Sequence, residues 1–87
     1  MSVYKNTFTT TQTDTVIITP ASGMSIIISS VKIKGTGTLK WATSGNEILS
    51  VQSGEMGTTG LVVGSVDEGI SISCDANTEV IIIYEEG

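Results

Sequence analysis

The strongest constraint on the fold of this chain is a two-residue alternation of apolar and polar side chains that returns in segment after segment. It is built from Ile, Val and Thr and interrupted by Gly, Asn and Asp. No stretch repeats apolar residues at the three- and four-residue spacing of an amphipathic helix. Such alternation is typical of half-buried β-strands joined by turns. We therefore expect an all-β protein.

About eight short strands can be placed, at a spacing of roughly ten residues. They cover residues 3–10, 14–19, 24–34, 38–43, 47–53, 61–63, 70–74 and 78–85. Strands this short pair more readily across two sheets than around one barrel. The pattern thus favours a small antiparallel β-sandwich of jelly-roll type. Residues 1–13 would form an N-terminal arm or the first strand, and residues 14–87 the β-sandwich domain.

The longest of these segments changes its buried face halfway along. Met24, Ile26 and Ile28 share one face, whereas Val31 and Ile33 have the opposite parity. Because side chains alternate strictly along a strand, a change of parity requires one extra residue. We expect a β-bulge or a sharp bend at residues 29–30.

Other segments give more local expectations. Residues 35–37 contain two glycines and predict a tight hairpin turn, and residues 54–60 predict a loose loop. Residues 80–84 are apolar on both faces, as in a central strand of a packed sheet. Cys74 has no second cysteine to pair with and lies in phase with neighbouring isoleucines, so we expect it to be buried.

The side chains that most enzymes need are missing or scattered. The chain has no histidine, which removes the usual general base and the commonest metal ligand. The carboxylates fall mostly at expected turns and strand ends. Oxygen ligands for calcium could come from Asp67 and Glu68, from Asp75 and Asn77, and from Glu85 and Glu86. None of them matches a loop motif, and Asp and Asn are ordinary turn residues. We therefore expect no enzyme, and no catalytic, cofactor-binding or metal-binding residue.

The net charge and the hydropathy of the chain limit the partners that it can bind. The net charge is −5, and Lys5, Lys32, Lys34 and Lys40 are the only basic residues. Nucleic-acid binding usually needs a basic face, so no nucleic-acid partner is expected. No apolar run approaches the length of a membrane span, and no signal peptide is recognisable, so we expect synthesis in the cytoplasm and no membrane partner.

Surface composition favours contacts with other proteins. Only 15% of the residues are charged, against about 25% in typical domains. Ser and Thr, which hydrogen-bond without a net charge, replace the missing charges. An 87-residue domain without a disulfide or a metal also has a thin margin of stability. We expect a homo-oligomer or a subunit bound to a larger assembly.

Two aromatic residues allow a different function. Trp41 and Tyr84 could form a stacking platform for sugars, as in carbohydrate-binding modules. Trp41 has the same parity as Leu39, however, and a lone Trp in an alternating strand usually belongs to the core. A buried role for Trp41 is therefore favoured.

The order of these features resembles a family of viral proteins. The segments that carry the resemblance are residues 24–33, residues 38–41, a Gly-Ile-Ser-Ile strand at residues 69–72, and a last strand ending in Tyr-Glu-Glu at residues 84–86. They are similar to small β-sandwich structural proteins of tailed bacteriophages, the head decoration or auxiliary proteins. The resemblance implies a non-enzymatic virion protein that binds the major capsid protein or other virion proteins. The N-terminal arm could then act as a tether. The alternative is a carbohydrate-binding or adhesive module of a tail or fibre.

Overall fold

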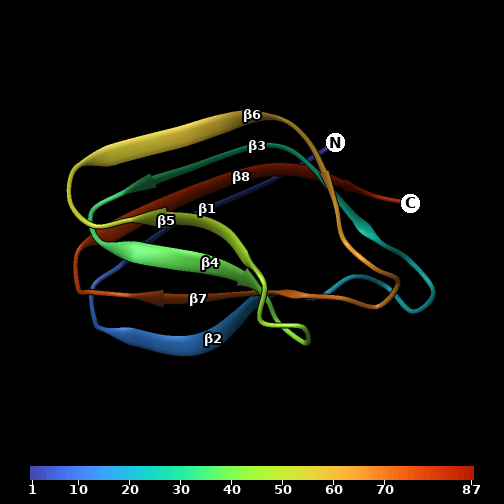
Figure 1. Cartoon of the computed structure of the whole chain (residues 1–87), viewed down its shortest axis with the longest axis horizontal. Helices are drawn as coiled ribbons and strands as arrows, with labels where there is room; N and C mark the ends of the chain where they lie inside the picture. Colours follow the sequence, from blue (N-terminus) through green and yellow to red (C-terminus); the bar gives the residue numbers. More distant parts are fainter.

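Two four-stranded antiparallel sheets face each other in the computed structural model, which describes all 87 residues (Figure 1). The first sheet has the order β1-β8-β3-β6 and contains β1 (Ser2–Phe8), β8 (Thr78–Glu86), β3 (Ile26–Lys34) and β6 (Glu55–Val63). The second has the order β2-β7-β4-β5 and contains β2 (Gln12–Ile18), β7 (Ile70–Cys74), β4 (Gly37–Trp41) and β5 (Glu47–Val51). This order is that of a jelly roll, so the expected all-β sandwich is confirmed.

The core lies between the two sheets and is made by alternate residues of their strands. In β7, Ile70, Ile72 and Cys74 are buried, and in β8, Val80 and Ile82 are buried. One contiguous cluster of 14 buried side chains results. Every strand except β6 contributes to this cluster, and the strands with one buried face show the two-residue period in the sequence.

β3 contains the β-bulge that the change of parity predicted. Ile28 is paired with Tyr84 of β8, and the next paired residue, Ser30, lies opposite Ile83, so Ser29 has no partner on β8. The extra residue reverses the parity of the strand, and both halves of β3 therefore send their isoleucines into the core. The prediction at residues 29–30 is confirmed.

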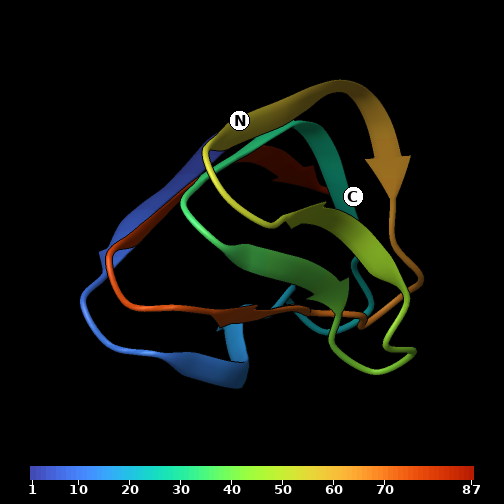
Figure 2. The same cartoon turned by 60° about the vertical axis from the view of Figure 1, so that its left-hand side comes forward.

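The same irregularity grows across the sheet. Two residues of β6, Gly60 and Leu61, lie opposite Ser29, because Ile28 pairs with Val62 and Ser30 pairs with Thr59. β6 therefore has one residue more than β3 at this point. Gly60 accommodates this with a φ of 124°, which L side chains rarely adopt. The outer strand is thus longer than its neighbour over the same distance, and Figure 2 shows β6 arching strongly. The bulge gives the first sheet its curvature.

The expected hairpin at residues 35–37 is wrong. β3 belongs to the first sheet and β4 to the second, so this turn crosses between the sheets. It passes close to β7 and β8: a Cβ at Gly35 would lie 2.7 Å from Thr78 Oγ1 in β8, and one at Gly37 would lie 2.8 Å from the Cβ of Cys74 in β7. Glycine is needed at these positions because the chain passes close to other strands as it crosses between the sheets. Glycines are also typical of hairpin turns, so the sequence alone does not distinguish a hairpin from such a crossing.

The loop expected at residues 54–60 is also wrong, since Glu55–Val63 is a continuous strand. β6 is an edge strand in which eight of nine residues are exposed, as its burial pattern shows. Only Val62 packs against the core, so burial imposes no alternating pattern on this strand. Its backbone pairing with β3 holds it in place instead.

The N-terminal residues form the other edge of the first sheet. β1 pairs with β8 without a register shift, from Ser2 opposite Tyr84 to Phe8 opposite Thr78. Residues 12 and 13 already belong to β2 in the second sheet. Residues 1–13 therefore supply β1 and the beginning of β2.

Deleting Ser29 should prevent folding, whereas Ser29→Ala should be nearly neutral. Without the extra residue, either Ile26 and Ile28 or Val31 and Ile33 must point outward. Exposing two buried aliphatic side chains costs about 3–6 kcal/mol, a large part of the 5–15 kcal/mol that stabilises a typical domain. Circular dichroism with thermal unfolding checks this. A deletion variant with a native-like melting transition would contradict the role of the bulge.

Candidate functional site

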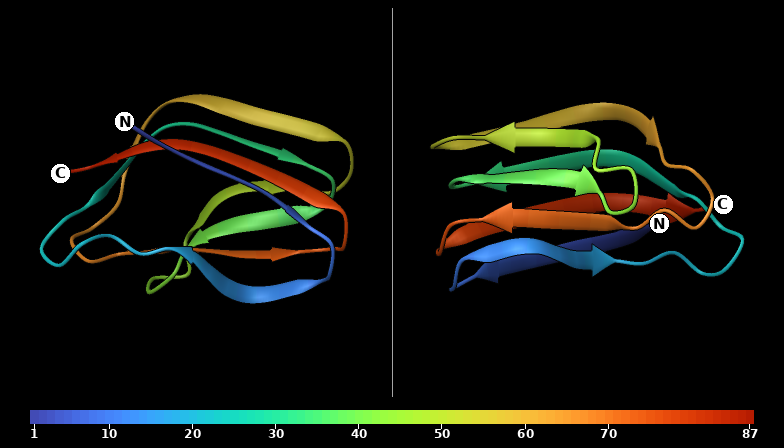
Figure 3. Two further views of the ribbon diagram at one scale, coloured as in Figure 1. Left: turned by 180° about the vertical axis from the view of Figure 1, so that it is seen from behind. Right: turned by 60° about the horizontal axis from the view of Figure 1, so that its bottom comes forward.

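The outer face of the first sheet carries an apolar strip. Its members point away from the core, because they alternate with the buried residues of their strands: Val3, Ile27, Val63, Ile81 and Ile83. Val3 lies opposite Ile83, and Ile27 lies opposite Val63. The three isoleucines are half-buried by their in-sheet neighbours, and the two valines are 64% and 61% exposed. No part of the chain forms a further layer over this strip, as Figure 3 shows (left).

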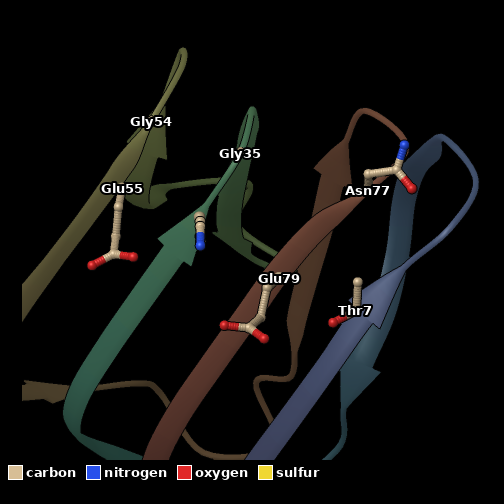
Figure 4. A pocket seen from close by; sticks show the side chains of 7 residues that line it. Thr7, Gly35, Gly54, Glu55, Asn77 and Glu79 are labelled. Atoms are coloured by element: carbon tan, nitrogen blue, oxygen red, sulfur yellow. The ribbon is translucent and has the colours of Figure 1, made fainter.

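A polar hollow borders the strip at one end of the sheet. It has a volume of about 520 Å³ and no hydrophobic lining residue: it is formed by Thr7, Lys34, Gly35, Gly54, Glu55, Asn77 and Glu79. Figure 4 shows the carboxylates of Glu55 and Glu79 on either side of the end of β3. Ligand sites are usually enclosed and largely apolar, so this open, polar hollow makes a poor small-molecule site. It is the charged rim of the outer face.

Lys5, Lys32 and Lys34 share the outer face of the first sheet, and Lys40 lies apart from them. Lys32 forms an ion pair with Glu55, with 3.1 Å between Nζ and Oε1. Lys40 lies on the second sheet, where its Nζ is 3.9 Å from Asp14 Oδ1. Both pairs are exposed to solvent, so each contributes little to stability.

The outer face of the second sheet is lined with hydroxyl groups instead. Thr38 and Ser50 hydrogen-bond to each other at 2.9 Å, and the backbone N–H of Asp14 donates to Ser73 Oγ at 2.9 Å. A hollow of about 320 Å³ lies here, lined by Thr11, Gln12, Thr36, Gly37, Thr38, Ser50, Val51, Gln52, Ser73, Cys74 and Asp75. The two outer faces therefore differ in chemistry: one carries an apolar strip and the other is polar.

Trp41 and Tyr84 do not form a shared platform. Trp41 ends β4 in the second sheet, and Tyr84 lies in β8 of the first sheet. Both are half-buried and pack against the core. The Trp41 ring also lies over Gly64, where a Cβ would come within 2.6 Å of its Cζ3 atom. Neither aromatic residue lines the hydroxyl-rich hollow.

Three of the turn carboxylates fasten the loops at one end of the sandwich. Glu68, which is 8% exposed, accepts hydrogen bonds from the backbone N–H groups of Thr43 and Ser44. Asp67 Oδ1 accepts one from the Gly23 N–H at 2.7 Å. Glu86 Oε1 accepts one from the Ala21 N–H at 2.5 Å. These carboxylates hold backbone amides of distant loops and do not converge on a common centre.

The turn between β7 and β8 is held by its backbone. Asn77 has a φ of 65° and donates its N–H to the Phe8 carbonyl at 2.6 Å. Thr78 Oγ1 donates to the Asp75 carbonyl at 2.9 Å. Asp75 and Asn77 therefore act as turn residues here. Nowhere in the molecule do three His, Cys, Asp or Glu side chains come together so that they could hold a metal ion.

Cys74 is a free, buried thiol, as its place among the isoleucines predicted. Desolvation by burial raises the pKa of this thiol, and the nearby Asp75 charge adds to the effect. A raised thiol pKa means a smaller thiolate fraction at neutral pH. Because the thiolate is the nucleophile, Cys74 is a poor one.

Comparison with family models, curated protein sequences and solved structures finds no match to this chain. The structure contains no helix that is long and apolar enough to cross a membrane. The geometry must therefore carry the argument about function. Its most distinctive element is the apolar strip, which sequence reasoning registered only as a strand with two apolar faces.

Glu68→Ala should lower the free energy of unfolding by about 1–3 kcal/mol, because two backbone N–H groups lose their buried acceptor. Glu47→Ala, at an exposed position in β5, is the matched control and should stay within about 0.5 kcal/mol. Urea unfolding of both variants measures the difference. Equal stability of the two variants would show that Glu68 does not fasten the loops.

Cys74 should react with a thiol reagent such as dithionitrobenzoate far more slowly in the native protein than in urea. Raising the pH above the ordinary thiol pKa should also reduce stability. The folded state keeps the thiol proton to higher pH than the unfolded state does, so this contribution is complete below that pKa and is lost above it. Labelling rates and unfolding curves at pH 7 and at alkaline pH measure both effects. Rapid native labelling at pH 7 would contradict the burial.

Proposed function

We propose that this protein is a non-enzymatic structural subunit that docks onto a larger protein assembly through the outer face of its first sheet. The observation that carries the proposal is the apolar strip. Exposed, contiguous apolar surface rimmed by polar groups marks interaction sites in soluble proteins. Here Lys5 and Lys32 flank Ile81 on the neighbouring strands, and Glu85 lies opposite Ile27, so charges of both signs rim the apolar side chains, as in an interface with an apolar centre and a charged rim.

The assembly that we propose is a virion, with the major capsid protein as the partner. The support is the resemblance of residues 24–86 to decoration and auxiliary proteins of tailed bacteriophages, together with the jelly-roll order of the strands. A low density of charge also suits an extended protein contact, because few charges have to be desolvated. The protein would then be made in the host cytoplasm and reside on the virion.

The first strand has a structural part in this proposal. An N-terminal tether would have to leave the sandwich, but Ser2–Phe8 is hydrogen-bonded along β8. Removing β1 would expose the edge of β8 and would take Phe8 out of the core. The docking surface is therefore assigned to the strip, and β1 contributes to it through Val3.

A carbohydrate-binding function has one observation in its favour, the hydroxyl-rich hollow on the second sheet. Sugar sites of this kind normally add an aromatic ring for stacking, and Trp41 and Tyr84 are not part of that hollow. A glycan array with the wild type and with Trp41→Ala tests this alternative. Binding that is lost in the variant would favour the adhesive module.

Replacing Ile81 and Ile83 together by Thr should weaken binding to capsids about 100-fold. Each change removes about two buried carbons, at roughly 0.8 kcal/mol per carbon, and 1.4 kcal/mol corresponds to a tenfold change in affinity. Thr is compatible with a β-strand, so the fold should persist. Co-sedimentation with purified capsids of the phage that encodes the chain measures the effect.

Val16→Thr is the matched control, since Val16 is an exposed valine on β2 in the other sheet. It should bind capsids as the wild type does. Equal binding by the double variant and the control would refute docking through the strip. If the wild type itself does not sediment with capsids, the virion assignment is wrong.

A further inference from the structure

The two sides of the sandwich end in open strand edges of different character. Figure 3 (right) shows β6 and β5 along one side and β1 and β2 along the other. Every edge strand presents unpaired backbone groups that can receive a further strand. Proteins usually blunt such edges with bulges, prolines or charges, so a further strand is best received by the longest stretch of edge without a register shift.

In the second sheet both edges are irregular. β2 has two register shifts against β7, one between Gln12 and Thr15 and one between Val16 and Ile18. Asp14, within β2, has a φ of 46°. β5 has a register shift opposite residues 39 and 40. These irregularities disfavour the addition of a strand to either edge of this sheet.

The first sheet has the longest regular stretches of open edge: β1 has no register shift, and β6 pairs regularly from Glu55 to Thr59, before its bulge at Gly60. β1 pairs with β8 over seven residues without a shift, so its free edge is regular. β6 is nine residues long, lacks proline and lysine, and carries one charge, Glu55. Its exposed Leu61 is 75% accessible to solvent. Neither edge is covered by another part of the chain.

The directions of the strands allow these two edges to meet. β1 is antiparallel to β8, β8 to β3, and β3 to β6, so β1 and β6 run in opposite directions. A second copy placed beside the first as a continuation of the sheet therefore presents its β1 antiparallel to β6. No inversion of either copy is required.

We propose that copies of this chain associate head to tail, with β1 of one copy added to β6 of the next. In the register that extends the existing rows of the sheet, Lys5 of the second copy lies opposite Gly57 and diagonal to Glu55. Diagonal cross-strand neighbours are about 7–8 Å apart at their Cα atoms, within reach of long side chains. Val3 of the second copy then covers Thr59 and approaches Leu61.

Charge selects this pairing over the two symmetric ones. β1 carries one basic residue, Lys5, and β6 carries one acidic residue, Glu55. Pairing β1 with a second β1 about Lys5 places two lysines opposite each other, and pairing β6 with a second β6 leaves Lys5 without a role. Only the unlike pair brings Lys5 near Glu55, which within its own chain also pairs with Lys32 at 3.1 Å. Because such a contact is not self-complementary, it produces a closed ring or an open chain and not a simple dimer.

Disulfide trapping tests the contact directly. The variant carries Val3→Cys and Thr59→Cys in a Cys74→Ala background. Within one chain, positions 3 and 59 are separated by β8 and β3, which places them about 14 Å apart at an inter-strand spacing of about 4.8 Å. A disulfide requires Cα atoms within about 7 Å, so only a contact between copies can form one. Mild oxidation of the purified protein should give a ladder of covalent oligomers on a non-reducing gel.

Each single cysteine variant in the same background is the control and should stay monomeric on that gel. Cross-linking of the Thr59→Cys variant alone would establish a β6–β6 contact and overturn the proposal. A double variant that remains monomeric at millimolar concentration would overturn it as well. The experiment needs no capsid, so its failure leaves docking through the apolar strip standing.

Charge reversal provides a second test that keeps Cys74 and leaves the core unchanged. Lys5→Glu and Glu55→Lys should each weaken self-association by about tenfold, because like charges then face each other. Mixing the two variants should restore association to within about twofold of the wild type. Sedimentation velocity measures all three samples. Association that is insensitive to Lys5→Glu would refute the assignment of β1.

Discussion

The unpaired residue in the middle of β3 is the constraint on which the rest of the sandwich depends. β3 lies between β8 and β6, so it contacts both of its neighbours along its whole length. Without Ser29, one half of the strand would turn its isoleucines toward solvent. With it, both halves supply the core, and the additional residues in β6 curve the sheet around that core.

The loops depend on a different interaction, the hydrogen bonds from backbone amides to carboxylates. Asp67, Glu68 and Glu86 each hold a loop that is far away in the chain. These carboxylates accept hydrogen bonds from backbone amides of the loops, so they are already occupied within the protein. The charges that remain on the outer face of the first sheet, by contrast, border the apolar strip.

The sequence predicts the elements that have one buried face and misses those that do not. β7 and β3 were recognisable because burial imposes alternation on them. β6 was not, because almost all of its side chains are exposed and only backbone pairing defines it. The crossing at Gly35 looked like a hairpin because a glycine permits both paths.

The candidate site was predictable in part. Residues 80–84 indicated a central strand with two apolar faces, and β8 is central, between β1 and β3. No part of this chain covers the second apolar face, so the pattern of residues within the chain cannot predict a partner for it. The burial of Glu68 was equally invisible, because its hydrogen-bond donors lie 24 and 25 residues away along the chain.

The pairing of β1 with β8 has a mechanical consequence. The two strands are antiparallel, so both chain ends lie at the same end of the molecule (Figure 1). Tension between these ends loads the pair formed by Ser2 and Tyr84 first, and the remaining pairs then open one after another. The sandwich therefore resists such tension only weakly, as a zip does. A neighbouring strand along the free edge of β1 would add a second row of hydrogen bonds that holds β1 in the sheet while this pair is under load.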